Sequence, residues 1–496
     1  MRKQLMILVL MLFPVLGMAQ GFNHQWLLGN QWLSSVPKAR MFFDTSSYTL
    51  QTEYRKMPFE GTEASICDAN GNFLMSSNGV WIANANNDTM LNGSGLNPGG
   101  TTSLYPHCLL LTYANIFIPF PGDSSKYILF HHTDSTFSNS YATYQIFTTT
   151  VDLTLDGGLG GIISKNNIVL ADTLNWGLAA CKHANGRDWW IVCQKENSDI
   201  IIEMLLTPNG ITNISYQSLG VPIARFNVTQ PTFSQDGSKF AYNRYDPSTG
   251  DESVIIADFD RCTGLFSNAH NIPVTLGTSV WGLAFSASAN YVYACSNNYI
   301  FQVNVTTLLV DTVATYDGFC YPNSPWCTTF WNMYLAANGK IYVTSGSGVQ
   351  HIHEMNYPDS TGFACDMQQH AIFLGVWNLR AVPNYPNYYL GPVAGSVCDS
   401  LGLSVQEINY DFRFRVYPNP VSSATGGLNI GYLLPQNKSG QFRIYDITGK
   451  VVFNYVLPQW SNEQSFTLPE LSDGVYNCVI TSGTERVSKK VAVMRE

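Results

Sequence analysis

A strand–turn–strand unit returns along the chain at intervals near fifty residues, and this repeat constrains the fold more than any other feature. Each copy has an apolar strand, a tight turn rich in Asn, Asp and Gly, and an aromatic strand. The copies span residues 64–74, 178–190, 231–242, 283–293 and 333–343. Asn-Gly and Asp-Gly pairs supply the positive φ that two-residue hairpin turns need. The expected turn positions are Gly71, Gly186, Gly237, Asn290 and Gly339, which are 115, 51, 53 and 49 residues apart.

The 115-residue gap leaves room for one more unit, which we expect to turn at residues 122–123. A last unit has only its inner strands, at residues 382–384 and 388–390. Strand-like pieces left over at residues 25–28, 41–44 and 48–54 would complete its blade. A period of about 40 to 50 residues with four short strands is typical of propeller blades. The sequence therefore predicts an all-β fold, a β-propeller with seven blades favoured over six; the alternative is a β-sandwich array.

Composition agrees with short strands and excludes one class of partner. The chain has 27 Tyr, 27 Phe, 11 Trp and 40 Gly, whereas charged residues make up only 12%. Residues 20–390 contain 15 basic and 26 acidic residues. An acidic body without basic clusters binds a phosphate backbone poorly. We therefore expect no nucleic-acid partner.

The N-terminus has the pattern of a signal peptide over residues 1–19. A basic start at Arg2 and Lys3 precedes an apolar run over residues 5–16, and small residues lead to a cleavage point between Ala19 and Gln20. The run is shorter than the roughly 20 residues of a membrane-spanning helix. No later segment has the length and polarity of a transmembrane helix.

All 11 Cys follow this leader, so the mature chain carries an odd number of thiols into an oxidising compartment. Cys320 and Cys327 are close enough in sequence to close one loop. Cys181 and Cys193 flank the predicted turn at Gly186 and are a second candidate pair.

Residues 391–412 contain Gly, Pro and Ser in a mixed polar run without strong alternation and are predicted to be a linker. Residues 413–496 alternate apolar and polar residues between turns at Gly449 and Gly474. This pattern predicts a small Ig-like antiparallel β-sandwich. One interpretation of this module is that it is an Ig-like adhesive domain.

Four blocks of this C-terminal segment carry a more specific resemblance. They are a Tyr417-Pro418-Asn419-Pro420 opening, a hairpin at Gly449-Lys450, a strand with Gly474 and Tyr476, and a basic ending at Lys489-Lys490. In order and spacing they resemble the type A sorting domain of the type IX secretion system. The resemblance implies that this machinery is a partner. It also implies passage through the periplasm, translocation across the outer membrane, and a body that is released or tethered at the cell surface.

The predicted propeller carries resemblances that concern structure only. The turn at residues 233–239 resembles that of WD40-like propeller repeats. Residues 60–65, 156–160 and 382–388 are similar to stretches in secreted propeller proteins of Bacteroidetes. That group implies a fold and a location, and no agreed activity.

Candidate metal sites are few. His351 and His353 share a strand face, and His370 is a candidate third ligand; the alternative is polar residues on a solvent-facing strand. The oxygen-rich residues 84–88 could bind Ca²⁺, although turn formation alone explains them. No other cofactor is predicted.

Aromatic residues are dense at residues 189–190, 321–331 and 385–389, where they would serve either ligand stacking or packing between blades. The favoured function is a non-enzymatic binding or adhesion protein for an extracellular glycan or protein. The alternative is a carbohydrate- or lactone-active hydrolase or lyase with a site at the propeller axis.

Overall fold

The computed structural model divides into two compact units, residues 1–399 and residues 400–496, and each is described by itself. The structure describes residues 21–494 except 45, 135–142, 224–229, 247–248, 277–278, 323–324, 400–413, 423–426, 433, 435–437, 460, 462, 470 and 484. The predicted signal peptide and its cleavage point at Ala19 and Gln20 lie outside the described residues.

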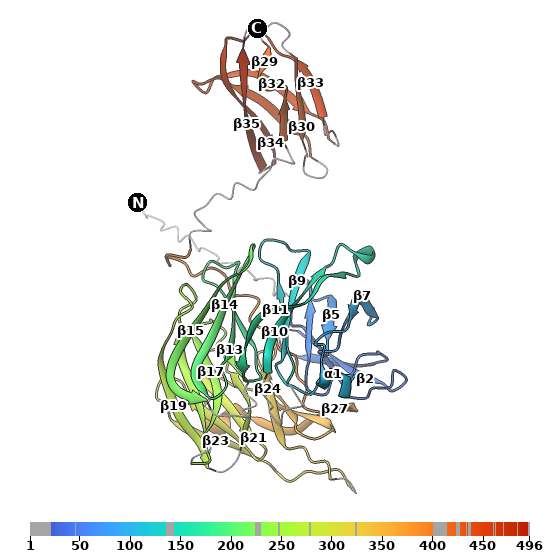
Figure 1. The fold of residues 1–496 in the computed structure, drawn as a ribbon, viewed down its shortest axis with the longest axis vertical. Coiled ribbons are helices and arrows are strands. Elements are labelled where there is room, and N and C mark those ends of the chain that lie inside the picture. The colour runs from blue at the N-terminus through green and yellow to red at the C-terminus, as the bar shows by residue number, and fades with distance from the viewer. Residues whose placement is uncertain are drawn as a thin grey trace, which may run out of the picture. The chain divides into compact units, whose positions relative to one another are not determined.

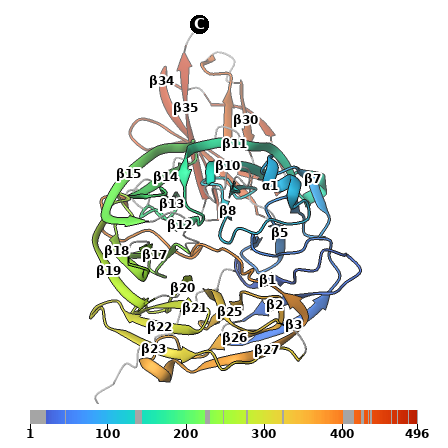
Figure 2. The same cartoon turned by 60° about the horizontal axis from the view of Figure 1, so that its bottom comes forward.

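The first unit is a ring of seven small antiparallel sheets, here called blades 1 to 7 (Figures 1 and 2). Blade 1 contains β1 (Gln25–Leu28), β2 (Lys38–Phe43) and β3 (Tyr48–Glu53). Blade 2 contains β4 (Ala64–Cys67), β5 (Phe73–Ser77), β6 (Trp81–Ala83) and β7 (Thr89–Ser94). Blade 3 contains β8 (Asn115–Pro119), β9 (Lys126–His131), β10 (Thr143–Asp152) and β11 (Gly161–Leu174).

Blade 4 contains β12 (Ala179–Lys182), β13 (Trp189–Gln194), β14 (Ser198–Thr207) and β15 (Gly210–Ile223). Blade 5 contains β16 (Thr232–Phe233), β17 (Lys239–Asp246), β18 (Asp251–Phe259) and β19 (Phe266–Leu276). Blade 6 contains β20 (Val280–Phe285), β21 (Tyr291–Ser296), β22 (Tyr299–Asn304) and β23 (Val310–Thr315). Blade 7 contains β24 (Phe330–Leu335), β25 (Ile341–Ser345), β26 (Val349–Met355) and β27 (Met367–Asn378).

The predicted all-β propeller with seven blades is confirmed. Blades 2 and 3 are continuous only through a parallel bridge between Leu91 of β7 and Gly161 of β11. Helical structure in the described residues is limited to α1 (Gly100–Leu104) and two 3₁₀ turns at Asp156–Gly158 and Gly362–Cys365. None of these helices is long or apolar enough to cross a membrane.

Strand β21 shows why the blades stack. Successive side chains of a strand point to opposite faces. Val292 and Ala294 pack with blade 5, whereas Tyr293 and Cys295 pack with blade 7. Both faces of the sheet are therefore buried, which explains why the strand is apolar throughout and why one blade needs a neighbour on each side.

Four of the five predicted turn positions are confirmed, but in the 283–293 unit the positive φ falls on Ala289 and not on Asn290. The loops are also longer than the two residues expected, since Asp68 N–H donates to Asn72 O and Gly71 N–H to Asp68 O. Gly71, Gly186 and Gly339 have positive φ, and Gly122 turns between β8 and β9 as expected. Gly237 is also sterically required, because a Cβ there would lie 2.7 Å from the Cys181 sulfur.

Blade 1 lacks the strand that is innermost in the other blades. The start of β1 lies beside the turn after β4, since the Gln25 side-chain amide donates to Gly71 O (2.6 Å). The end of β1 lies just before β4, since Phe59 N–H donates to Gly29 O (3.0 Å). Thus β1 runs antiparallel to β4 and corresponds to the second strand of a blade.

Residues 379–390, here called the axial segment, occupy the place of the missing strand. The expectation that residues 382–384 and 388–390 are strands is wrong, because they make no backbone ladder with β1. The segment instead crosses the middle of the ring, as the orange ribbon in Figure 2 shows. The axial segment meets blade 1 through side chains, and Asn30 N–H after β1 donates to Trp377 O of β27 (3.0 Å).

Side chains of the axial segment bind the inner strands around the ring. Tyr385 OH donates to Gln25 O (2.8 Å), and Tyr388 OH donates to Phe117 O (2.8 Å). The Asn384 side-chain amide donates to Asn115 O (3.2 Å) and to Leu178 O (2.9 Å). These bonds reach blades 1, 3 and 4, so the segment fills the axis and holds the blades together.

Residues 391–399, assigned to a linker from the sequence, contact the body. Arg261 donates to Gly391 O (2.6 Å), Val393 N–H donates to Ala184 O (2.8 Å), and Cys398 forms a disulfide with Cys262. The compact unit accordingly ends at residue 399.

The Cys320–Cys327 disulfide predicted from sequence is present. The predicted Cys181–Cys193 pair is wrong: both thiols are free, and they point into different hydrophobic clusters on opposite faces of blade 4.

The second unit is a two-sheet sandwich, as predicted. One sheet contains β28 (Phe414–Tyr417), β30 (Gly427–Tyr432) and β33 (Glu463–Thr467). The other contains β29 (Val421–Ser422), β35 (Glu485–Met494), β34 (Gly474–Ser482), β31 (Gly440–Tyr445) and β32 (Val451–Leu457). Phe414, Ile430, Phe442, Ile444 and Val491 belong to the single core between them.

Candidate functional site

The ring axis holds only a small cavity. The first strands of blades 4 to 7 and the axial segment line it, with Tyr113, Gln230, Tyr334 and Asn384 among its polar residues. The space open to a water-sized molecule is about 40 Å³, room for a few waters, whereas small-molecule sites usually span about 300–1,000 Å³. No Asp, Glu or His of the described chain lines the cavity.

The histidines proposed as metal ligands lie on β26 and β27. His370 N–H donates to His353 Nδ1 (3.0 Å), and His370 Nε2 pairs with Asp317 (2.9 Å). His351 Nδ1 bonds the Tyr321 hydroxyl (2.5 Å). Within the described ranges, no group of three or more His, Cys, Asp or Glu is placed to hold a metal ion.

The oxygen-rich residues 84–88 form a turn. Asn84 Oδ1 accepts the N–H groups of Asn86 (3.0 Å) and Asp88 (3.1 Å), and Asp88 pairs with Lys56 (2.6 Å). Two of the oxygen atoms considered for Ca²⁺ binding, Asn84 Oδ1 and Asp88 Oδ1, therefore already have protein partners.

The three aromatic-rich segments, residues 189–190, 321–331 and 385–389, differ in how far their rings are exposed. Trp189 and Trp190 are buried between blades, and Tyr385 and Tyr388 are buried on the axis. Trp326, within residues 321–331, is 49% exposed. Ligand stacking is therefore open to the region around residues 321–331 and to Tyr389, which is 38% exposed, but not to Trp189 and Trp190.

Six side chains near residues 321–331 lie at one edge of the ring, and this set is here called the aromatic rim. They are Trp32, Glu60, His107, Trp281, Trp331 and Arg380. Glu60 and His107 precede β4 and β8, and Trp281 and Trp331 are the second residues of β20 and β24. Trp32 and Arg380 follow β1 and β27. All six are thus at the edge where the first strands of the blades begin.

A stack of three planar groups forms the centre of the rim. The rings of Trp281 and Trp331 are parallel within 13°, with centroids 4.0 Å apart. The Arg380 guanidinium carbon lies 5.1 Å from the Trp331 ring centroid, within cation–π range. Gly346 permits this packing, because a Cβ there would lie 2.4 Å from the Trp331 ring.

Hydrogen bonds fix the backbone of Arg380, whereas its guanidinium has no carboxylate or hydrogen-bond partner among the described residues. Its carbonyl accepts from the Asn332 amide (2.6 Å) and the Thr344 hydroxyl (3.0 Å). Among the described residues, no carboxylate lies within 4 Å of the guanidinium, and its buried Nε has no hydrogen-bond partner. Burial lowers the pKa of Arg380, and the negative charge of Glu60 opposes this shift.

Glu60 supplies the acidic side of the rim. Burial raises its pKa, against a hydrogen bond from Cys108 and the charges of Arg380 and His107. His107 also stacks on Trp32, with ring centroids 4.8 Å apart, and the Trp32 side chain is 56% exposed. The rim therefore combines the exposed Trp32 ring and the half-buried Trp281 and Trp331 rings with a cation and a carboxyl group.

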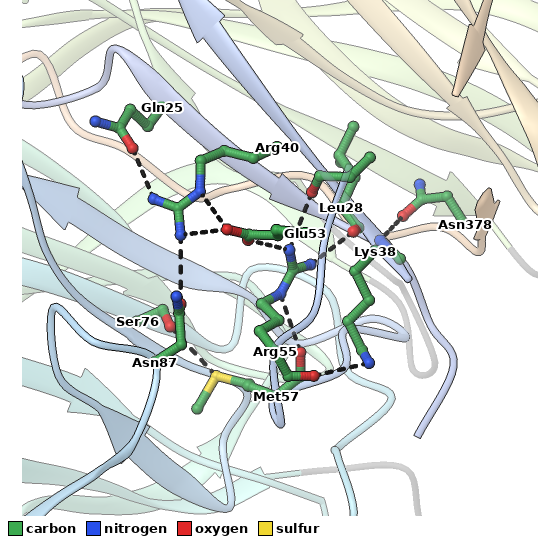
Figure 3. Close-up of polar contacts among 12 residues, drawn as sticks. Gln25, Leu28, Lys38, Arg40, Glu53, Arg55, Met57, Ser76, Asn87 and Asn378 are labelled. Carbon is green, nitrogen blue, oxygen red and sulfur yellow. Dashed lines mark hydrogen bonds and ion pairs between the residues drawn. The ribbon is translucent and has the colours of Figure 1, made fainter. Parts of the chain in front are cut away.

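A buried cluster of charged residues fixes the loop that carries Trp32 (Figure 3). The buried Lys38 ammonium donates to Leu33 O (3.1 Å) and Arg55 O (2.9 Å), and burial lowers the pKa of Lys38 to about 8. Asn378 Oδ1 accepts Gly29 N–H at the start of the loop (2.9 Å). This support reduces the conformational freedom that a ligand would otherwise have to remove.

Sequence reasoning missed most of the rim. Only Trp331 lay in a group singled out for its aromatic density. A usable signal was present, because Trp281 and Trp331 occupy the same position in two successive repeat units. The other members lie in loops that are far apart in the sequence. These loops come together only when the ring closes, so their proximity could not be predicted from local sequence.

The second unit gathers its predicted motif residues. The Asn419 side chain donates to Lys490 O (3.1 Å) and accepts Ala492 N–H (2.9 Å), so the opening motif is tied to the last strand. Gly449, Tyr476 and Lys490 line one surface hollow of about 590 Å³. The remaining lining residues are Tyr445, Asp446, Ile447, Val475, Asn477 and Arg486.

Comparisons with known proteins give structural neighbours of low similarity, and no curated protein matches the chain. A putative 6-phosphogluconolactonase from Bacteroides fragilis is 12% identical, with a TM-score of 0.43, over 73% of this chain and 98% of that chain. The periplasmic gluconolactonase PpgL of Pseudomonas aeruginosa is 11% identical, with a TM-score of 0.40, over 73% and 98%. PorZ, a surface component of the type IX secretion system of Porphyromonas gingivalis, is 13% identical, with a TM-score of 0.30, over 92% and 68%.

Because these TM-scores are below 0.5, none of the likenesses bears on activity. One family match is direct: residues 415–494 match the family described as the secretion system C-terminal sorting domain. The C-terminal unit of this chain is therefore a type IX sorting domain, and the protein is one that is secreted or attached to the cell surface.

Proposed function

We propose that this protein is a non-enzymatic recognition protein, exported by the type IX machinery, that binds an extracellular glycan at the aromatic rim. The Trp281–Trp331–Arg380 stack is the observation that carries the proposal. Aromatic faces provide large, rigid contact areas, and a few fixed polar groups give orientation. The N-terminal residues 1–19 would bring the chain to the periplasm as a signal peptide.

The ring supports this function by presenting the rim on fixed elements. Glu60 and Arg380 flank the ring faces with hydrogen-bonding groups of both kinds, which suits hydroxyl-rich ligands. The axial segment fills the interior, so a ligand would be held at the ring edge. The alternative of a hydrolase or lyase has no such support, because the axial cavity is small and its lining lacks carboxylates and histidines in the described residues.

A glycan array probed with the secreted protein tests this function. Trp281→Ala should weaken retention of the bound glycans about 3- to 10-fold, since aromatic stacking contributes about 0.5–1.5 kcal/mol. Phe363→Ala is a matched control, because Phe363 is 81% exposed but lies in the turn between β26 and β27, away from the rim edge. Equal losses in both variants, or no glycan bound by the unaltered protein, would overturn the proposal.

A further inference from the structure

We propose that the glycan bound at the rim carries a carboxylate, as a uronic acid does, and that Arg380 binds that carboxylate. This inference rests on the proposed function and specifies its ligand. Four observations lead to it.

The first observation is that Arg380 differs from the other described arginines of the body. Arg40 and Arg55 pair with Glu53, Arg187 pairs with Asp188, and Arg244 pairs with Asp246. Arg261 has no carboxylate but donates to backbone carbonyls. Arg380 alone in this described set has neither kind of partner for its guanidinium.

The second observation is a pair of unused donors. Arg380 Nε and Trp331 Nε1 are both buried and have no hydrogen-bond partner in the described residues. A buried donor without an acceptor costs about 1–3 kcal/mol, so such groups in a native protein call for an explanation. The guanidinium carbon lies over the Trp331 ring, 5.1 Å from its centroid, and Arg380 as a whole is only half-buried, so an acceptor would approach the guanidinium from its solvent side. A carboxylate fits the guanidinium fork with two parallel hydrogen bonds.

The third observation is that Glu60 does not fill this role. The negative charge of Glu60 interacts with Arg380 at a distance, but the two groups form no ion pair within 4 Å. The Glu60 carboxyl group instead accepts a hydrogen bond from Cys108. Its carboxyl group therefore remains beside the site and can bind a sugar hydroxyl.

The fourth observation limits the charge of the ligand. Residues 20–390 have 26 acidic and 15 basic residues, so a dense polyanion is repelled at long range. A single carboxylate next to Arg380 interacts within the roughly 8 Å over which charges are felt at physiological salt. A short acidic glycan on the exposed Trp32 face and the half-buried Trp281 face meets both conditions. A peptide C-terminus offers the carboxylate but not the flat, hydroxyl-rich face.

The test uses the secreted full-length protein and calorimetric titration with trigalacturonate and, separately, neutral galactotriose. The unaltered protein should bind trigalacturonate more tightly. Arg380→Gln should weaken trigalacturonate about 10- to 100-fold, as expected for lost hydrogen bonds to a charged group, and should weaken neutral galactotriose by a clearly smaller factor, because Gln keeps a hydrogen-bond donor for hydroxyl groups. Arg380→Lys, which keeps the charge and loses the fork, should be intermediate. Unchanged thermal unfolding would show that each variant is folded.

Equal affinity for both sugars, with no effect of Arg380→Gln on either, would overturn the inference and leave glycan recognition standing. Binding of neither sugar, together with an empty glycan array, would overturn both. Tighter binding of a peptide with a free C-terminal carboxylate than of trigalacturonate would also reject the acidic glycan.

Discussion

Cys262 and Cys398 are bonded to each other across 136 residues of sequence, and this disulfide joins the turn after β18 to the segment that leaves the ring axis. The axial segment is thereby held at both ends. Its start is fixed by Asn378, which accepts Gly29 N–H, and its end by Cys398. The ring is therefore closed by a covalent bond and a filled axis, without a shared hydrogen-bonded blade.

Removing this disulfide should destabilise the ring. We expect Cys262→Ser/Cys398→Ser to lower the free energy of unfolding by about 2–4 kcal/mol, measured by urea denaturation, because the bond closes a long loop. Cys320→Ser/Cys327→Ser is the matched control, since that bond closes a loop with a sequence separation of only 7. A larger loss in the control would contradict this account of ring closure.

The end of the folded body is a second prediction. A chain covering residues 20–399 keeps the axial segment and its disulfide, so it should unfold cooperatively at the melting temperature that the body has in the full chain. A chain ending at residue 380 loses Tyr385, Tyr388 and Asn384 with their buried hydrogen bonds. It should be unfolded or aggregate. Calorimetry distinguishes the two, and a stable, cooperative 20–380 chain would refute the role given to the axial segment.

Local features of this fold could be predicted from the sequence, and contacts between distant segments could not. The turns at Gly71, Gly237 and Gly339 follow from the positive φ that Gly adopts readily, a property of a few neighbouring residues. The failure at residues 382–390 has the opposite cause. Tyr385 and Tyr388 match the aromatic strand pattern, but a position on the axis gives their hydroxyls partners on several blades.

The rim and the Cys262–Cys398 disulfide both join segments that are far apart in the sequence. The charges of Glu60 and Arg380 interact only because the ring closes, and Cys262 meets Cys398 only because the chain returns across the ring. No spacing in the sequence encodes either encounter. The C-terminal sorting domain was predictable, because its blocks follow one another in order and spacing within one short stretch of sequence, residues 415–494.

Buried carboxyl groups predict a specific pH dependence. Glu252 on β18 is buried, and burial raises its pKa to about 8, whereas the ordinary value is 4.5. The folded state holds this carboxyl group neutral, whereas the unfolded chain ionises it above about pH 4.5. The contribution of Glu252 to the free energy of unfolding is therefore highest below about pH 4.5 and falls as the pH rises to about 8. Glu252→Gln keeps the shape without the charge. The variant should therefore gain on the order of 2–4 kcal/mol relative to the unaltered protein between pH 5 and pH 8.5.

Denaturant unfolding at these two pH values measures that difference. Asp311→Asn is the control, because Asp311 is exposed on β23 of the neighbouring blade and should show the same offset at both pH values. Parallel stability curves for Glu252→Gln and the unaltered protein would show that this carboxyl group is not held neutral in the fold.

The surface hollow of the sorting domain yields the last prediction. Ile447 is 88% exposed beside it, and Lys490 lines it together with Arg486, so the hollow pairs an apolar tip with positive charge. Side chains alternate along β35, so Lys490 points outward, whereas Val491 enters the core. Lys490→Glu and Ile447→Asp should each leave the domain folded but reduce export, with the protein accumulating in the periplasm. Lys438→Glu alters an exposed lysine of the same unit outside the hollow. Immunoblots of culture medium, cell surface and periplasm should show normal export for this control, and normal export of all three variants would exclude the hollow as the docking surface.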